Sequence, residues 1–148
     1  MLDVAVFAED ALDAQAQAIA ANSLRVAVEL EPGAAVGDPV LVERLVANLI
    51  DNAVRHNVPA GWIEMSTGER DGMAFISVAN SGPVIGESQV PSLFDPFHRL
   101  APHPGPDGPD GAGLGLSIVA SVVAAHNGQL IARPSPGGGL AMDVLLPT

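Results

Sequence analysis

The stretch NLIDNAVRH (residues 48–56) lies in a run of apolar residues at helical spacing, yet it contains two asparagines, which are poor helix formers. On a helix, Asn48, Asn52 and Arg55 fall within roughly 60° of one another. This polar stripe lies about 100° from the centre of the apolar stripe, on the shoulder of the helix. Its amide oxygens could ligate a hard cation such as Mg²⁺ and its arginine could meet a phosphate, although a solvated surface is the simpler interpretation of the stripe alone.

The composition predicts a single folded domain over residues 1–148. Hydrophobic residues make up 48% of the chain, which is enough for one core at this length. The net charge is −11 and all six basic residues are arginines, so we expect no binding to nucleic acid. The absence of cysteine excludes disulfides and thiolate zinc sites. No apolar run approaches the ~18 residues of a membrane span, and the acidic start does not match a secretory signal, so we expect a cytoplasmic domain without membrane contact.

The apolar spacing predicts helices and antiparallel strands in one α+β domain. Asp3 and Asp38 are the expected N-caps, and Pro39 takes the first helical position after Asp38. Asp71-Gly72 predicts a hairpin, and Asn127-Gly128 predicts a helix end. The expected elements are helices over residues 4–19, from 39 onwards and over 114–126, and strands over 24–30, 62–70, 73–80, 129–133 and 140–147. This order indicates a two-layer α/β sandwich with a mixed, mostly antiparallel sheet covered on one face by three helices.

Residues 81–113 carry many prolines and glycines and predict a long loop. A loop of this length in a compact domain is usually a functional lid or a disordered segment. Within it, only PSLFDPF (residues 91–97) has the pattern of a short ordered element.

Two glycine-containing motifs border this loop. VANSGPVI (residues 78–85) ends a strand at Asn80, and Gly82 follows. This motif is either a plain turn or a strand end that faces a ligand, with glycine allowing close backbone approach. GAGLGLSIV (residues 111–119) opens a helix with three glycines, which form either a hinge or an anion site at the helix N-terminus. It is not a P-loop, because the chain has no lysine.

The order and spacing of the motifs resemble those of the catalytic ATP-binding domain of bacterial sensor histidine kinases. The motifs are N-L-I-D-N-A, V-A-N-S-G-P, L-F-D-P-F, G-L-G-L-S-I-V and a glycine-rich last hairpin, so the resemblance covers essentially the whole chain. Such domains have the Bergerat fold, which gyrase-type, chaperone and mismatch-repair ATPases share. The resemblance implies that the domain binds ATP with Mg²⁺, and that residues 83–112 form a lid over the phosphates. It also implies that the γ-phosphoryl group passes to a histidine on a separate dimerisation and phosphoacceptor helical domain of the same sensor, and indirectly to a response regulator in two-component signalling.

The resemblance also implies roles for individual residues. Asn52 matches the Mg²⁺-ligating asparagine, Asn48 is its partner one turn earlier, and Arg55 matches the basic residue that meets the phosphates, so these three are the candidate catalytic residues. His56 takes the position beside the nucleotide that is usually aromatic. Asn80 stands where the family has an aspartate that accepts the adenine amino group. The other implied nucleotide-binding positions are Gly82, Ile85, Phe94, Phe97, Gly111, Gly113, Leu114, Gly115 and Leu116.

The chain departs from the family pattern at three points. Asn80 keeps an acceptor oxygen but lacks the charge of aspartate, and a charge-assisted hydrogen bond is roughly twice as strong as a neutral one. Val84 replaces the second glycine of this motif. None of the four histidines is followed by the acidic, Leu, basic and Pro pattern of a phosphoacceptor. His98, His103 and His126 also lack metal-ligand spacing, so we expect these three to be surface or capping histidines. These departures imply weakened but retained nucleotide binding, in the C-terminal part of a longer, membrane-anchored sensor.

Three other functions share this fold. A stand-alone anti-sigma-type serine kinase would phosphorylate a partner serine, but that family lacks the L-F-D-P-F element in this form. A degenerate, non-catalytic regulatory module would use the pocket only for protein contacts. A gyrase-type ATPase with its own turnover would carry a catalytic glutamate where Asn48 stands.

Overall fold

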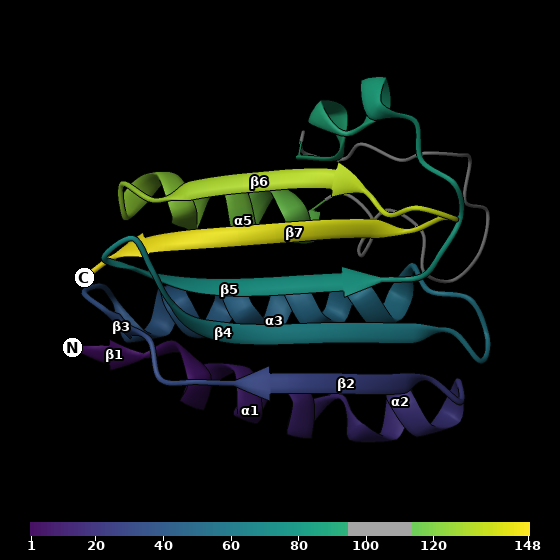
Figure 1. Cartoon of the computed structure of the whole chain (residues 1–148), viewed down its shortest axis with the longest axis horizontal. Helices are drawn as coiled ribbons and strands as arrows, with labels where there is room; N and C mark the ends of the chain where they lie inside the picture. Colours follow the sequence, from purple (N-terminus) through teal and green to yellow (C-terminus); the bar gives the residue numbers. More distant parts are fainter. Residues whose placement is uncertain (95–113) are drawn as a thin grey trace.

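The computed structural model describes residues 1–94 and 114–148, apart from the side chain of Leu114. It has two layers, a five-stranded sheet and a layer of helices on one of its faces (Figure 1). The helices are α1 (Val4–Ala14), α2 (Ala16–Ala21), α3 (Pro39–Arg55) and α5 (Leu114–Ala125), with the short 3₁₀ helices η1 (Glu87–Gln89) and η2 (Pro91–Phe94). The strands are β1 (Leu2–Asp3), β2 (Arg25–Leu30), β3 (Ala34–Ala35), β4 (Trp62–Arg70), β5 (Met73–Asn80), β6 (Gln129–Pro134) and β7 (Leu140–Pro147).

The sheet is mixed and mostly antiparallel, as the sequence predicts. Its strand order is β2-β4-β5-β7-β6. β2 pairs with β4 in parallel, and the other neighbouring strands pair antiparallel. β1 and β3 form a separate two-stranded pair.

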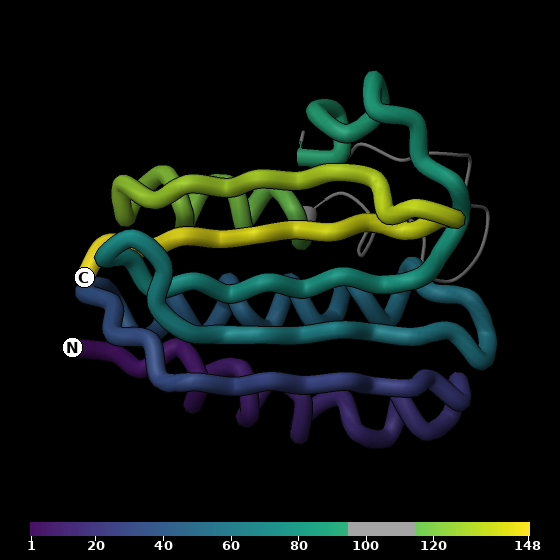
Figure 2. Tube along the Cα trace, in the orientation of Figure 1, coloured from purple at the N-terminus to yellow at the C-terminus, as the bar shows by residue number. Residues whose placement is uncertain are grey.

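α3 forms the centre of the helical layer, between α1 and α5 (Figure 2). Its apolar stripe includes Leu45 and Leu49, which are fully buried in one cluster with Ile63 of β4 and Ile76 of β5. Burial of a side chain of this size stabilises the fold by about 1.5–3 kcal/mol. The helix that carries residues 48–56 is therefore also the main core helix of the domain.

Local signals explain where several elements begin and turn. The carboxylates of Asp3 and Asp38 each accept a hydrogen bond from the amide two residues further on, at 3.0 and 2.9 Å, so both predicted N-caps are confirmed. Asp71 and Gly72 have φ values of 54° and 77°, as a two-residue hairpin turn with right-handed strand twist requires.

The predicted single helix over residues 4–19 is wrong, because the chain breaks at Gln15 into α1 and α2. Gln15 has φ −101° and ψ 5°, and its amide donates to the Leu12 carbonyl at 3.1 Å. α2 has no fully buried residue and packs against the core only through the partly buried Ala18 and Ile19, so it contributes less to the core than α1. The β1–β3 pair is absent from the sequence prediction, since strands of two residues have no detectable periodicity.

The described part of the predicted lid contains η1 and η2, and η2 lies within PSLFDPF. The rest of that prediction, residues 95–112, lies outside the described residues, as does Gly113. Among the helices of the described ranges, none is long and apolar enough to cross a membrane.

Candidate functional site

Asn80 ends β5 and is 2% exposed, on the sheet face that the helices cover. Its Nδ2 donates a hydrogen bond to the Ser81 carbonyl at 2.7 Å, which fixes the orientation of the amide, because the reverse orientation would set two oxygens against each other. Oδ1 is buried and has no hydrogen-bond partner among the described residues. An unpaired buried acceptor costs about 1–3 kcal/mol, so Asn80 offers a site for a donor group of a ligand.

The turn between β6 and β7 supports the end of β5. A Cβ on Gly139 would collide with the Asn80 carbonyl, and a Cβ on Gly138 would collide with the Gly82 carbonyl. Gly138 and Gly139 also have φ values of +119° and +99°, which residues with a side chain rarely adopt. The sequence analysis named this glycine-rich hairpin as a motif but did not predict that it supports the end of β5.

Gly82 brings the turn after β5 close to the end of α3. A Cβ at this position would lie 2.5 Å from the carbonyl oxygen of His56, the C-cap residue of α3. The sequence analysis expected glycine to allow a ligand close to the backbone here; the group that the structure places against Gly82 is the C-terminus of α3. His56 is itself half-buried at this junction.

A polar network fixes the same two segments. Ser81 Oγ donates to Asn57 Oδ1 at 2.6 Å and accepts from the Trp62 amide at 2.8 Å. Asn57 Nδ2 donates to the carbonyls of Ala53 and Trp62 at 3.1 and 3.0 Å. Asn57 thus joins the end of α3 to β4 and to the residue after β5. The sequence analysis did not single it out; an asparagine directly after a helix C-cap was the available signal.

The polar stripe of α3 approaches the N-terminus of α5. Asn52 is 8% exposed, Asn48 is half-buried and Arg55 is exposed, as expected for the shoulder of a core helix. Asn48 Nδ2 donates to the Arg44 carbonyl at 2.9 Å, and its Oδ1 lies 3.4 Å from where a Cβ on Gly115 would be. The free amides of a helix N-terminus attract anions, whereas amide oxygens suit a hard cation. This end of the site therefore fits a cation together with phosphate groups.

Arg55 lies in an exposed network with Asp51 and Gln15. Its Nε donates to Asp51 Oδ2 at 2.8 Å, and the two side chains are 41% and 37% exposed. Asp51 Oδ1 accepts from Gln15 Nε2 at 3.3 Å. An exposed ion pair contributes about 0.2–1 kcal/mol, so a bound phosphate could compete with Asp51 for the guanidinium.

The remaining expected residues are described only in part. Ile85 and Phe94 pack against the core, and Leu116 is buried. The backbone of Leu114 begins α5. The side chain of Leu114 and the residues Phe97, Gly111 and Gly113 lie outside the description.

The structure thus gathers the described site residues at two places along α3. His56, Asn80 and Gly82 meet at its C-terminus, and Asn48 meets Gly115 near its middle, with Asn52 one turn further on. Among the described residues, no cluster of His, Cys, Asp or Glu could hold a metal ion. The expected Mg²⁺ ligands are amides, and Mg²⁺ usually completes its shell with water and substrate phosphates. These donors therefore fit Mg²⁺ bound together with a phosphate-bearing substrate.

Comparison with known proteins defines the class. Residues 37–148 match the histidine kinase-, DNA gyrase B- and HSP90-like ATPase family. The chain belongs to this family.

Two relatives indicate the branch of the family. Sensor protein CutS of Streptomyces coelicolor is 42% identical over 148 residues, which cover 99% of this chain and 35% of CutS. The signal transduction histidine-protein kinase BaeS of Escherichia coli is 36% identical over 111 residues, which cover 75% of this chain and 24% of BaeS. The chain therefore corresponds to a part of these longer proteins, the ATPase domain of sensor histidine kinases.

Solved structures confirm the fold. The mycobacterial sensor histidine kinase MprB superposes with a TM-score of 0.83 at 26% identity, over 99% of this chain and 95% of that one. The catalytic domain of histidine kinase ThkA superposes with a TM-score of 0.79 at 20% identity, over 99% and 94% of the two chains. The expected two-layer α+β sandwich and the resemblance to histidine kinase catalytic domains are both confirmed.

Proposed function

We propose that this domain binds ATP with Mg²⁺ and donates the γ-phosphoryl group to a histidine on a separate dimerisation and phosphoacceptor helical domain of the same kinase, from which a response regulator receives it. Family membership supports ATP binding, and the sensor kinases among the relatives support a histidine acceptor. The observation that carries the proposal is the buried, unpaired Oδ1 of Asn80. In this proposal the domain works in the cytoplasm, as part of a longer, membrane-anchored sensor.

Asn80 would select adenine because its Oδ1 can only accept a hydrogen bond. The exocyclic amino group of adenine is a donor, whereas guanine has a carbonyl oxygen at the corresponding position. Rotation of the Asn80 amide to suit guanine would cost its hydrogen bond to Ser81. Because Asn80 is neutral, its bond to adenine is about half as strong as that of an aspartate. We therefore expect binding that is weaker than with a carboxylate at this position.

At the phosphate end, the chain's own residues mainly position the substrate and offset charge, as phosphoryl transfer requires. Asn52 and Asn48 would hold the metal through their amide oxygens, and the first amides of α5 would receive phosphate oxygens. When bound, Mg²⁺ supplies positive charge that offsets both the phosphates and the chain's net charge of −11. Arg55 would release Asp51 and form an ion pair with a phosphate instead. The bond between the γ-phosphorus and the oxygen of ADP breaks as the bond to the histidine nitrogen forms, and no base on this chain is needed.

Calorimetric titration of ATP and GTP, each with and without Mg²⁺, tests this proposal. We expect Mg²⁺-dependent ATP binding and at least about tenfold weaker GTP binding, the equivalent of one lost hydrogen bond. Asn80→Leu should weaken ATP binding by about the same factor and leave GTP binding little changed, because it removes the acceptor that distinguishes the bases. Asn52→Ala should remove the Mg²⁺ dependence.

The matched control is Asn22→Ala, since Asn22 lies after α2 and its side chain bonds only to the Ala18 carbonyl among the described groups. This variant should bind ATP like the unmodified chain. A chain that binds neither nucleotide under any of these conditions would contradict the proposal and favour a regulatory module without catalytic activity.

A further inference from the structure

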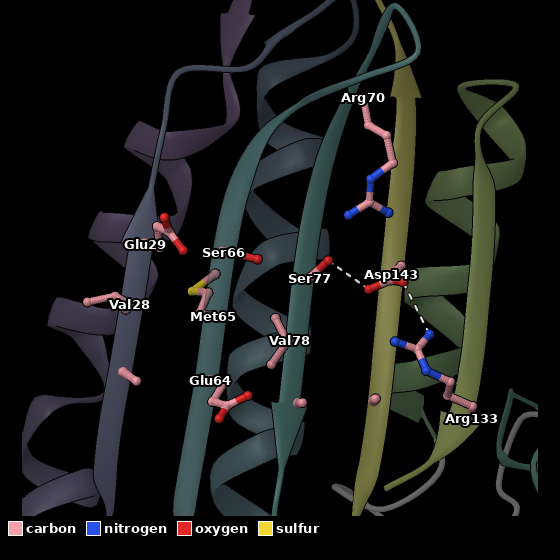
Figure 3. Close-up of a pocket in the computed structure, with 13 residues that line it drawn as sticks. Val28, Glu29, Glu64, Met65, Ser66, Arg70, Ser77, Val78, Arg133 and Asp143 are labelled. Carbon is pink, nitrogen blue, oxygen red and sulfur yellow. Dashed lines mark hydrogen bonds and ion pairs between the residues drawn. The ribbon is translucent and has the colours of Figure 1, made fainter.

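The face of the sheet turned away from the helices contains a shallow hollow of about 430 Å³ (Figure 3). α1, α3 and α5 all lie on the opposite face (Figure 1). The floor of the hollow consists of small side chains from four neighbouring strands, which are Ala27, Ser66, Ser77, Ala79 and Ala141. Such a floor lets another surface approach the backbone of the sheet closely.

The two sides of the hollow carry opposite charges. Glu29 of β2 and Glu64 of β4 lie on one side (Figure 3). Arg133 of β6 lies on the other side. Arg70 reaches over β5, and its guanidinium carbon is 4.4 Å from the centroid of the Phe75 ring. The face therefore has an anionic half over β2 and β4 and a cationic half over β5, β7 and β6.

Hydrogen bonds and strand register fix this arrangement. Ser77 Oγ donates to Asp143 Oδ1 at 2.6 Å, and Arg133 Nη1 donates to Asp143 Oδ2 at 3.2 Å. The Arg133 side chain is still 57% exposed, so it can bind a second carboxylate. Glu29, Ser66, Ser77 and Asp143 are direct cross-strand neighbours, which sets the spacing between the two halves.

The balance of charge on this face contrasts with the rest of the chain. The chain carries a net charge of −11, so two copies repel each other over most of their surfaces. The outward positions of the five strands instead carry equal numbers of both signs, which are Arg25, Arg70, Arg133, Glu29, Glu64 and Asp143. A second copy of the chain can therefore approach this face without net repulsion from it.

We propose that the open face of the sheet is the interface of a homodimer. A two-fold axis that lies in the interface and runs parallel to the strands sets β2 and β4 of one copy over β6 and β7 of the other. The anionic half of each copy then faces the cationic half of its partner, with Glu29 opposite Arg70 and Glu64 opposite Arg133. The small floor residues allow the spacing of about 10 Å at which two sheets pack. This inference goes beyond the proposed function and does not depend on nucleotide binding.

The size of the face sets the strength of the expected dimer. Five strands about 4.8 Å apart and about six residues long make a face of about 20 Å by 20 Å. Two such faces bury on the order of 1,000 Å² in total, at the low end for specific interfaces. We therefore expect a weak dimer, with a dissociation constant of about 0.1–1 mM.

Sedimentation equilibrium of the chain from about 10 μM to 1 mM spans this range of dissociation constants and tests the proposal. Arg70→Glu and Glu29→Arg should each raise the dissociation constant at least about tenfold, since each makes two like-charge contacts per dimer. An equimolar mixture of the two variants should associate again, because the exchanged charges restore both pairs across the interface. This recovery is specific to a two-fold interface in which Arg70 faces Glu29.

The matched control is Arg44→Glu on α3, which changes the net charge as much as Arg70→Glu but lies in the helical layer. It should leave the dissociation constant within about twofold, since its charge lies outside the interface. Circular dichroism and ATP titration confirm that each variant is folded. Three results would overturn the proposal: a chain that stays monomeric throughout, a dimer that neither charge reversal weakens, or a mixture that does not recover association. A monomeric chain is also the result expected if another protein segment covers this face.

Discussion

At the scale of single residues, the position of Asn80 Oδ1, which has no partner among the described residues, depends on Gly139 in the β6–β7 hairpin. Gly139 comes so close to the Asn80 carbonyl that a methyl group has no room, and its amide donates to the Pro83 carbonyl at 2.9 Å. The β6–β7 turn therefore supports the backbone of the turn after β5, while the Asn80 side chain faces the side of the sheet that the helices cover. The unpaired Oδ1 is preorganised rather than free to turn toward water or another donor.

Replacing Gly139 by alanine should damage this site. The new methyl group would both collide with the Asn80 carbonyl and force a side-chain-bearing residue to φ +99°. We expect the free energy of unfolding to fall by at least about 2 kcal/mol more than in Gly137→Ala, where φ is also positive but no atom lies within 4 Å of the added Cβ. Urea unfolding of both variants measures the difference, and equal losses would show that only backbone strain matters.

The residues that the sequence could and could not reveal differ in the range of their contacts. Asn48, Asn52 and Arg55 stand out because they break a local helical pattern, and local patterns are visible in one sequence. Asn57, Ser81 and Gly139 act through partners that only the folded sheet brings together. No periodicity marks such contacts, so the polar network behind Asn80 had to be found in the structure.

At the scale of elements, His126 joins the end of α5 to the start of α3. Its Nε2 accepts from the Asp38 amide at 3.1 Å, and its Nδ1 lies 2.8 Å from the Val122 carbonyl. Gly37 makes room for the ring, since a Cβ there would lie 2.5 Å from Nε2. The expected capping role of a histidine is present here, and it links the two helices that carry the candidate site.

A double-mutant cycle between Gly37 and His126 tests this link. Gly37→Ala should destabilise the chain by about 1–3 kcal/mol, because it displaces the imidazole, and His126→Ala should cost about 1–2 kcal/mol through lost hydrogen bonds. The two losses should not add, because alanine at position 37 has space once the ring is gone. Chemical unfolding of both single variants and the double variant gives the coupling, and simple additivity would contradict the proposed contact.

Element boundaries were predictable where the chain carries its own signal. Asp38 followed by Pro39 marks the start of α3, and Asp71-Gly72 marks the β4–β5 turn. The break at Gln15 has no proline or glycine to mark it. The residues after it reach the core only through the partly buried side chains of Ala18 and Ile19, and such packing is a property of the tertiary fold.

At the scale of the whole molecule, the order of motifs predicted the fold, and the net charge governs its response to salt. The chain has 17 acidic and 6 basic residues, so its folded state concentrates negative charge that the unfolded chain spreads out. Exposed ion pairs such as Arg55–Asp51 contribute less than this repulsion.

Salt should therefore stabilise the domain. Raising NaCl from about 20 mM to about 0.3 M shortens the screening length from about 20 Å to about 6 Å, which weakens long-range repulsion more than close pairs. We expect the free energy of unfolding in urea, an uncharged denaturant, to rise by about 0.5–2 kcal/mol. A fall with salt would instead mean that ion pairs outweigh the excess of negative charge.

The contact between Asn80 and Gly139 also has a consequence for synthesis on the ribosome. The chain emerges from its N-terminus at about 5–20 residues per second, so β5 leaves the ribosome several seconds before the turn that supports it. During that interval the polar stripe of α3 is already made, but Asn80, the adenine acceptor of the proposed function, has no fixed position. In that proposal, nucleotide binds and stabilises the nascent domain only after the β6–β7 turn has emerged, and the earlier segments fold without help from it.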